Sequence, residues 1–150
     1  MPLFRRSRPS DEPRVAAALA DAAAAGAAPP APEATRELER IAALPLTELA
    51  AQVMAVVADQ TAPFGSDSER HESVSISEVV DAYCAARTIA LPPGSHRYFR
   101  EAMWTLAVAR LVAPDRNRLG PAPDYAPTRD GLAALQRGDV AEILARRLRD

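Results

Sequence analysis

Apolar residues recur at helical spacing from Thr35 to the end of the chain, whereas the first 34 residues show no such spacing. Side chains three or four positions apart share one face of a helix, and an apolar face packs into a core. The spacing predicts helices that begin near Thr35, Thr47, Ser77, Ser95, Thr128 and Val140. Except at Val140, each predicted start is a hydroxyl residue, which can accept a hydrogen bond from the first free backbone N–H groups.

The apolar face of each helix supplies candidate core residues: Leu38, Ile41, Ala42, Leu49, Val53, Val56, Val57, Val79, Val80, Tyr83, Cys84, Phe99, Met103, Leu106, Leu132 and Leu135. Between the helices, alternation over Ser73–Ser77 predicts one short edge strand that leads directly into a helix capped by Ser77. Prolines at 114, 121, 123 and 127 exclude a central strand and favour a hairpin loop with ragged arms.

The first 34 residues have the composition of a tail. A basic start is followed by a nearly pure alanine run and a proline-rich linker. We therefore expect a disordered arm over 1–34 and a folded domain over 35–150. Acidic residues at 11, 12 and 21 argue against a secretory signal, and the apolar run is too short to span a membrane. The basic segment 4–8 is a candidate DNA arm or membrane-surface tether, but disorder is the preferred interpretation.

Composition narrows the functional classes. The chain has 150 residues, 48% hydrophobic and 25% charged, with a net charge of -2, which suits one soluble domain plus a tail. A single cysteine excludes a disulfide scaffold and favours a reducing cytoplasm. His71 and His96 have no cysteine or paired acid at metal-ligand spacing, and Cys84 has no adjacent histidine. No enzymatic activity, metal or cofactor is therefore predicted.

The order of elements from 47 to 135 is helix, short strand, helix, tight turn, helix, two-armed hairpin, helix. With the core residues Phe99, Met103, Leu106, Leu111 and Val112 and the segment Tyr125-Ala126-Pro127-Thr128-Arg129-Asp130-Gly131-Leu132-Ala133-Ala134-Leu135, this order resembles the winged helix-turn-helix regulators of bacteria. In that superfamily the segment leaving the wing commonly reads Tyr, any residue, Leu, Thr, two residues and Gly before a leucine-bearing helix. Pro127 replaces the leucine here.

The resemblance covers roughly residues 73 to 135 and implies a mainly α fold with a small β-wing, here with extra terminal helices. The aromatic of the second wing strand would cover the core, the threonine would cap the next helix, and the glycine would permit close packing. The long loop over 60–72 and the proline-rich wing depart from the compact family pattern.

The resemblance also implies double-stranded DNA as a partner, with the third helix (95–110) in the major groove and the wing (114–124) on phosphates. The contact candidates are Ser95, His96, Arg97, Arg100, Arg116 and Arg118. Between Gly94 and Arg129, six arginines stand against three acidic residues, whereas the first 75 residues hold seven arginines and eleven acidic residues. This asymmetry favours a cytoplasmic, homodimeric transcriptional regulator. The alternative is that Arg97 and Arg100 are ordinary solvated residues.

Other residues favour a protein-interaction subunit of a larger complex built on the same fold. Glu101 would repel phosphate, and Trp104 falls on the outward side if Phe99 and Met103 are core residues. Trp104 then either packs against the first helices or marks a protein contact. The last helix supplies further interface candidates, because its apolar face, with Ile143, Leu144 and Leu148, exceeds what a small core can cover.

Overall fold

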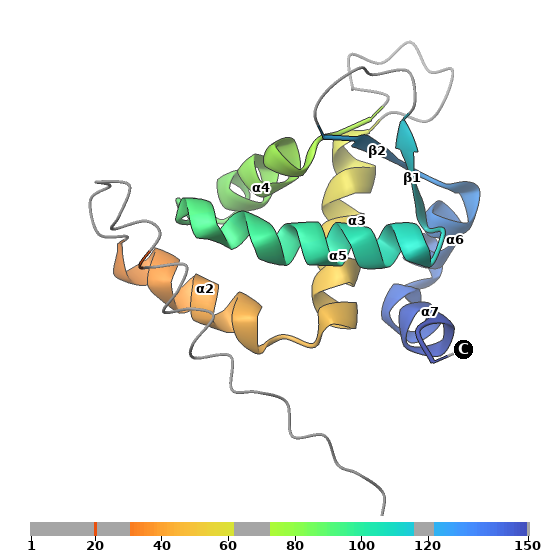
Figure 1. Ribbon diagram of the computed structural model, residues 1–150, viewed down its shortest axis with the longest axis horizontal. Helices are drawn as coiled ribbons and strands as arrows, with labels where there is room; N and C mark the ends of the chain where they lie inside the picture. Colours follow the sequence, from red (N-terminus) through yellow and green to blue (C-terminus); the bar gives the residue numbers. More distant parts are fainter. Residues whose placement is uncertain (1–19, 21–30, 62–72, 116–121, 150) are drawn as a thin grey trace, which may run out of the picture.

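The described part of the chain is mainly helical and carries one small antiparallel sheet (Figure 1). The computed structural model describes residues 20, 31–61, 73–115 and 122–149. Its helices are α2 (Pro32–Ala43), α3 (Leu46–Gln60), α4 (Ile76–Ala85), α5 (His96–Val108), α6 (Arg129–Arg137) and α7 (Val140–Arg147), and its strands are β1 (Val112–Asp115) and β2 (Asp124–Pro127). The predicted class, mainly α with a small β element, is confirmed. The long loop, except its first residues, and most of the predicted arm lie outside the described residues.

α3 lies at the centre of the packing, in contact with α4, α5, α6, α7 and β2. In Figure 1 it stands behind α5 and crosses it. The buried side chains of these two helices form the middle of the core: Leu49, Val53, Met54, Val57, Phe99, Met103 and Leu106. The predicted apolar stripe of α5 is therefore confirmed, and its opposite face is left for solvent or a partner. Of the other predicted core residues, Val56, Cys84, Leu132 and Leu135 are only partly buried.

β2 lies between β1 and the chain around Val74. β1 and β2 pair antiparallel from Val112↔Pro127 to Asp115↔Asp124. On the other side of β2, Tyr125 and Val74 exchange both backbone hydrogen bonds, at 2.8 and 2.9 Å. The predicted edge strand over 73–77 is thus reduced to a single bridge, because the backbone is already committed to the next helix at Ser75. The buried Tyr125 ring covers the core, as expected.

Ser75, and not Ser77, caps α4. The Ser75 hydroxyl accepts a hydrogen bond from the Glu78 backbone N–H at 3.2 Å, while the Ser75 backbone N–H donates to the Glu78 carboxylate at 2.7 Å. This reciprocal capping box satisfies two backbone donors that the first helical turn leaves free. Ser77 lies inside the helix, where its exposed side chain has no capping position.

The first two helices also begin earlier than predicted, because prolines start them. α2 has Pro32 in its first turn, and α3 follows Pro45, so Thr35 and Thr47 lie within the helices rather than at their caps. The fixed φ angle of proline suits a helix start, and its missing N–H costs nothing there. Neither helix has a side-chain cap, and the Thr35 hydroxyl instead donates to the Ala31 carbonyl.

The segment leaving β2 behaves as predicted. The Thr128 hydroxyl caps α6 by accepting a hydrogen bond from the Gly131 N–H at 3.0 Å. A Cβ atom at Gly131 would lie 2.0 Å from the Leu111 carbonyl oxygen, so only glycine allows α6 to approach the chain before β1 this closely. Gly138, with φ of 73°, ends α6 in the left-handed conformation that glycine adopts readily.

No single helix in the described ranges combines the length and apolar character needed to cross a membrane, although α2 and α3 taken together, with a bend of 118° between them, meet that criterion.

Candidate functional site

The outward face of α5 carries a mixture of charged and large apolar side chains. Arg97, Arg100 and Glu101 lie toward its N-terminal end, and Trp104 and Val108 follow on successive turns. Trp104 is 66% exposed and Val108 is 55% exposed. The prediction that Trp104 faces outward is confirmed, and the interpretation that it packs against the first helices is wrong. The core opposite is already filled by Phe99 and Met103, so the indole has no internal site.

The predicted DNA contacts have unequal access to a ligand. Ser95 is wrong as a contact residue, because the short 3₁₀ turn Pro93–Ser95 carries its side chain inside, with no exposed surface. His96 and Arg97 are partly buried, and Arg97 donates to the Tyr98 hydroxyl at 3.2 Å and lies 5.0 Å from the Tyr98 ring centre. Arg100 is exposed. The candidates on the predicted wing, Arg116 and Arg118, lie outside the described residues.

The predicted protein interface on α7 is also divided. Leu144 is fully buried in the core of its own chain, so it is wrong as an interface residue; the helix turns this side chain toward α3 and away from solvent. Ile143 is partly buried against the same core. Leu148, which follows the helix, is 47% exposed. Of these three side chains, Leu148 alone offers a partner substantial apolar surface.

The end of α7 is tied to the end of α5. Arg147 donates a hydrogen bond from Nη1 to the Ala109 carbonyl, which immediately follows Val108. Leu148 therefore belongs to the same side of the molecule as the C-terminal end of α5. We call Trp104, Val108 and Leu148 the apolar strip. They are the exposed large hydrophobic residues that the described part of the chain contains.

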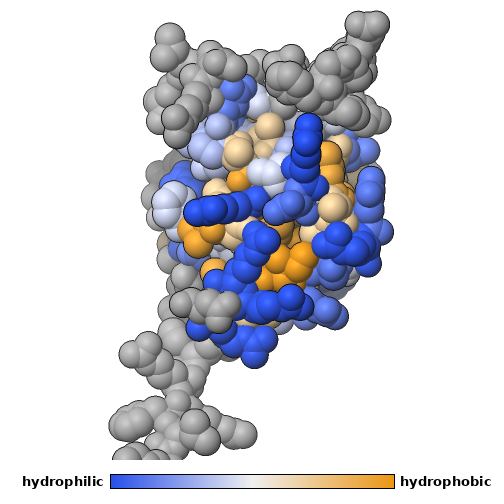
Figure 2. Space-filling model, turned by 90° about the vertical axis from the view of Figure 1, so that its right-hand side faces the viewer, coloured by the Kyte–Doolittle hydropathy of each residue, from blue (hydrophilic) through white to orange (hydrophobic). Residues whose placement is uncertain are grey.

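The side of the molecule where α5 ends and α7 lies shows apolar side chains gathered between hydrophilic ones (Figure 2). Exposed arginines on α5, just after it, and on α7 accompany the apolar strip: Arg100, Arg110, Arg146, Arg147 and Arg149. Scattered exposed apolar residues are normal on a soluble protein, but apolar residues gathered inside a polar rim are typical of interaction surfaces. This arrangement makes the apolar strip the candidate site.

A polar cluster joins α2 to α4, and no local sequence pattern indicates it. Arg40 donates two hydrogen bonds to the Glu37 carboxylate, at 2.7 and 2.8 Å. The Tyr83 hydroxyl donates to the same carboxylate at 2.5 Å and accepts from Arg40 at 2.6 Å. Arg87 lies 3.3 Å from Glu37 and 3.7 Å from the centre of the Tyr83 ring. We call these four residues the α2–α4 cluster.

Each charge in the α2–α4 cluster faces a partner within the chain. The hydrogen bonds from Arg40 are the main reason that the pKa of Glu37 is lowered, and Glu37 in turn raises the pKa of Arg40. Burial, with the hydrogen bond to Glu37, raises the pKa of Tyr83 to about 12. A tyrosine held neutral and donating to a satisfied carboxylate has a structural role, so the cluster fastens α2 to the rest of the domain.

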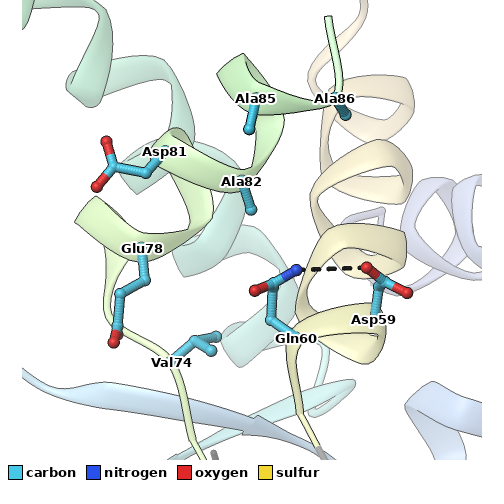
Figure 3. Close-up of a pocket in the computed structure, with 8 residues that line it drawn as sticks. All are labelled: Asp59, Gln60, Val74, Glu78, Asp81, Ala82, Ala85 and Ala86. Atoms are coloured by element: carbon cyan, nitrogen blue, oxygen red, sulfur yellow. Dashed lines mark hydrogen bonds between the residues drawn. The ribbon is translucent and has the colours of Figure 1, made fainter. Parts of the chain in front are cut away.

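A shallow pocket of about 550 Å³ lies between the end of α3 and α4 (Figure 3). Alanines 82, 85 and 86 line one side of it, and Asp59, Glu78 and Asp81 stand around it. The three carboxylates point in different directions, Glu78 is occupied in the α4 cap, and Asp59 accepts a hydrogen bond from Gln60 at 3.3 Å. Within the ranges that the structure describes, no group of three or more His, Cys, Asp or Glu residues is arranged to hold a metal ion. The pocket therefore assembles no catalytic group.

Comparison of the chain with known protein families, with curated proteins and with solved structures gave no match. The function must therefore be argued from the residues and their geometry.

Proposed function

We propose that this chain is a winged-helix protein-interaction module that docks a partner on the outward face of α5. The order α3, Val74 bridge, α4, α5, β1, β2, α6 supports the winged-helix interpretation, since it follows the order predicted from the sequence. Placement of β2 between Val74 and β1 supports it further, because the segment before α4 forms a bridge to the hairpin. In this fold α5 is the helix that regulators insert into DNA.

The exposure of Trp104 carries the proposal. Base edges in the major groove are mostly polar, and the thymine methyl is their main apolar feature. A tryptophan and a valine on successive turns of the outward face match that groove poorly. Tryptophan is, by contrast, among the commonest residues to contribute most of the binding energy in protein interfaces. The outward face of α5 therefore suits a protein surface better than a duplex.

DNA binding is the second candidate, and the arginines at the N-terminal end of α5 favour it. Arg97 and Arg100 lie three positions apart on the outward face, and Arg100 is exposed. Arginine pairs well with guanine edges and with phosphates because its planar group donates two hydrogen bonds. On this proposal the chain is a homodimeric transcriptional regulator, and the segment after β1 contacts phosphates.

The single tryptophan makes the first proposal directly measurable. Partners that copurify with the full-length chain are identified, purified and titrated against it while Trp104 fluorescence is recorded. We expect the emission to shift to shorter wavelength and to become protected from iodide, because docking removes the indole from water. Trp104→Ala should weaken binding by about 30-fold. Arg36→Ala, at an exposed position on α2, should leave binding unchanged. A partner that binds both variants equally contradicts the proposal.

A random fluorescent duplex tests the second candidate. Polarisation is followed as salt is raised from about 50 to 200 mM, with the Arg97→Ala/Arg100→Ala double variant in parallel. A steep salt dependence that the double variant flattens would establish DNA binding through α5 and would displace the protein-docking proposal. Absence of binding at the lowest salt concentration contradicts the DNA candidate.

A further inference from the structure

Two residues of the apolar strip lie on α5, and the third follows α7. Trp104 and Val108 are four positions apart, so they lie on the same face of α5, about 6 Å apart along its axis. The hydrogen bond from Arg147 to the Ala109 carbonyl brings the end of α7 to the point where α5 ends, and Leu148 follows directly. Anchors arranged in this way match a helix that presents apolar side chains on successive turns.

The rim of the apolar strip is mainly basic, with Glu101, three positions before Trp104, as its acidic member on α5. Arg100, Arg110 and Arg146 are exposed, and none of the three makes an ion pair within the described ranges. Arg147 is engaged with the Ala109 carbonyl and lies 3.9 Å from Asp130, and Arg149 donates to the Ala145 carbonyl. Arg36 and Arg129 are also exposed and make no ion pair within the described ranges, but three unpaired arginines accompany the strip in sequence: Arg100 four positions before Trp104, Arg110 two after Val108 and Arg146 two before Leu148. These three favour an acidic partner.

A second copy of the chain fits this surface poorly. In a symmetric dimer the same patch meets itself, so the arginine rims would face each other and repel. In an asymmetric contact the acidic α2–α4 region would have to cover the strip. Between residues 31 and 92, the described part holds seven acidic residues and three arginines. It exposes no large hydrophobic residue there that could enter the strip.

We infer that the partner on the apolar strip is an acidic amphipathic helix, with apolar side chains against Trp104, Val108 and Leu148 and with carboxylates toward Arg100, Arg110 and Arg146. This inference rests on the proposed protein-docking function and adds the chemistry of the partner. The apolar anchors supply most of the affinity, and the charges select the partner and set its orientation.

Selection from a displayed random peptide library tests the inference without knowledge of the natural partner. The peptides are about 16 residues long, enough for roughly four helical turns. They are selected on the purified full-length chain after removal of those that bind Trp104→Ala. We expect the recovered peptides to carry apolar residues at helical spacing and an excess of Asp and Glu. Helical content of the Trp104→Ala variant, measured by circular dichroism, controls for folding.

One recovered peptide is then synthesised and titrated. Trp104→Ala should weaken its binding by about 30-fold. Arg110→Glu and Arg146→Glu should each weaken it by about two- to fivefold, less at high salt. Arg36→Glu is the matched control, because Arg36 is an exposed arginine on α2 and should not affect the peptide.

The outcomes separate the inference from the function on which it depends. Peptides that need Trp104 but are neutral or basic, and that tolerate both charge reversals, overturn the acidic-helix inference and leave protein docking intact. Failure to recover any peptide that needs Trp104 contradicts both. A wild-type chain that sediments as a dimer, becomes monomeric on Trp104→Ala and excludes the peptide identifies a second copy as the occupant. Displacement of the peptide by duplex DNA identifies a nucleic-acid face.

Discussion

The two ends of the domain differ in whether their charged and apolar groups find partners within the chain or are exposed to solvent. In the α2–α4 region, Glu37 is held by Arg40, Tyr83 and Arg87, so buried polar groups find partners inside the chain. In the α5–α7 region, Trp104 and Arg100 point into solvent. Groups that are satisfied internally contribute to stability, whereas exposed groups of high binding potential are available to a partner. On the proposed function, the difference divides the domain into a structural region and a candidate docking region.

The sharpest test of this division lies within α7, at two leucines one turn apart. Leu144 is fully buried, and Leu148 is 47% exposed. Leu144→Ala leaves a cavity and should lower the free energy of unfolding by about 2 to 5 kcal/mol. Leu148→Ala should change it by no more than about 0.5 kcal/mol. Urea denaturation of both variants measures the difference.

Peptide binding completes this comparison. Leu148→Ala should weaken the peptide selected on the apolar strip while leaving the urea midpoint of the chain near that of the wild type. If Leu148→Ala proves as destabilising as Leu144→Ala, the end of α7 belongs to the structural region, and the apolar strip loses its third member.

Helical periodicity predicted which face of α5 is turned outward, because that helix is long and strongly amphipathic. Phe99, Met103 and Leu106 define its buried side. Once these residues are assigned to the core, helical geometry alone predicts that Trp104 faces outward. Local chemistry likewise predicted the Thr128 cap, and the winged-helix resemblance implied the close packing at Gly131. The face of α5 and the Thr128 cap depend on residues close together in the chain or on one side of one helix, whereas Gly131 meets the Leu111 carbonyl, a contact between distant parts of the chain.

Features that depend on tertiary contacts were missed. Glu37 and Tyr83 are 46 positions apart, and no local pattern pairs them. The periodicity of α7 places Leu144 and Leu148 on one face of the helix. It does not indicate at which residue the packing of that face against α3 ends. Ser95 is of a residue type that commonly caps helices, but the 3₁₀ turn to which it belongs buries its side chain.

The α2–α4 cluster provides the next largest effect. Tyr83→Phe keeps the ring against Phe99, at a centroid distance of 5.0 Å, and removes only the hydroxyl between Glu37 and Arg40. It should lower the free energy of unfolding by about 1 to 3 kcal/mol, because hydrogen bonds to charged groups are lost in a buried site. Tyr98→Phe is the matched control, since its hydroxyl only accepts one longer bond from Arg97. An equal loss in both variants would contradict a special role for the cluster.

The α2–α4 cluster should also give the free energy of unfolding a characteristic dependence on pH. The pKa of Tyr83 rises from its ordinary value of 10.0 to about 12 in the folded chain. Its contribution is fully present below pH 10 and is lost as the pH rises from 10 to about 12. The lowered pKa of Glu37 gives a contribution that is present above its ordinary value of 4.5 and is lost as the pH falls through the depressed value. Tyr83→Phe should flatten the alkaline loss in urea midpoints measured against pH.

The smallest effect concerns the start of α4, and it tests whether the structural region satisfies its backbone as fully as its side chains. The sequence Ser75-Ile76-Ser77-Glu78 offers two hydroxyls, and Glu78 decides between them: it stands three residues after Ser75, which is the spacing of a capping box. Ser75→Ala should therefore lower the free energy of unfolding by about 1 kcal/mol. Ser77→Ala, at an exposed position inside the helix, should be neutral or slightly stabilising, because alanine has the higher helix propensity. Equal effects of the two substitutions would mean that Ser75 is not the cap and that α4 starts at another residue. The position of Val74 relative to β2 would then differ as well. Opposite effects would show that the chain fixes the start of this helix with its own Ser75 and Glu78.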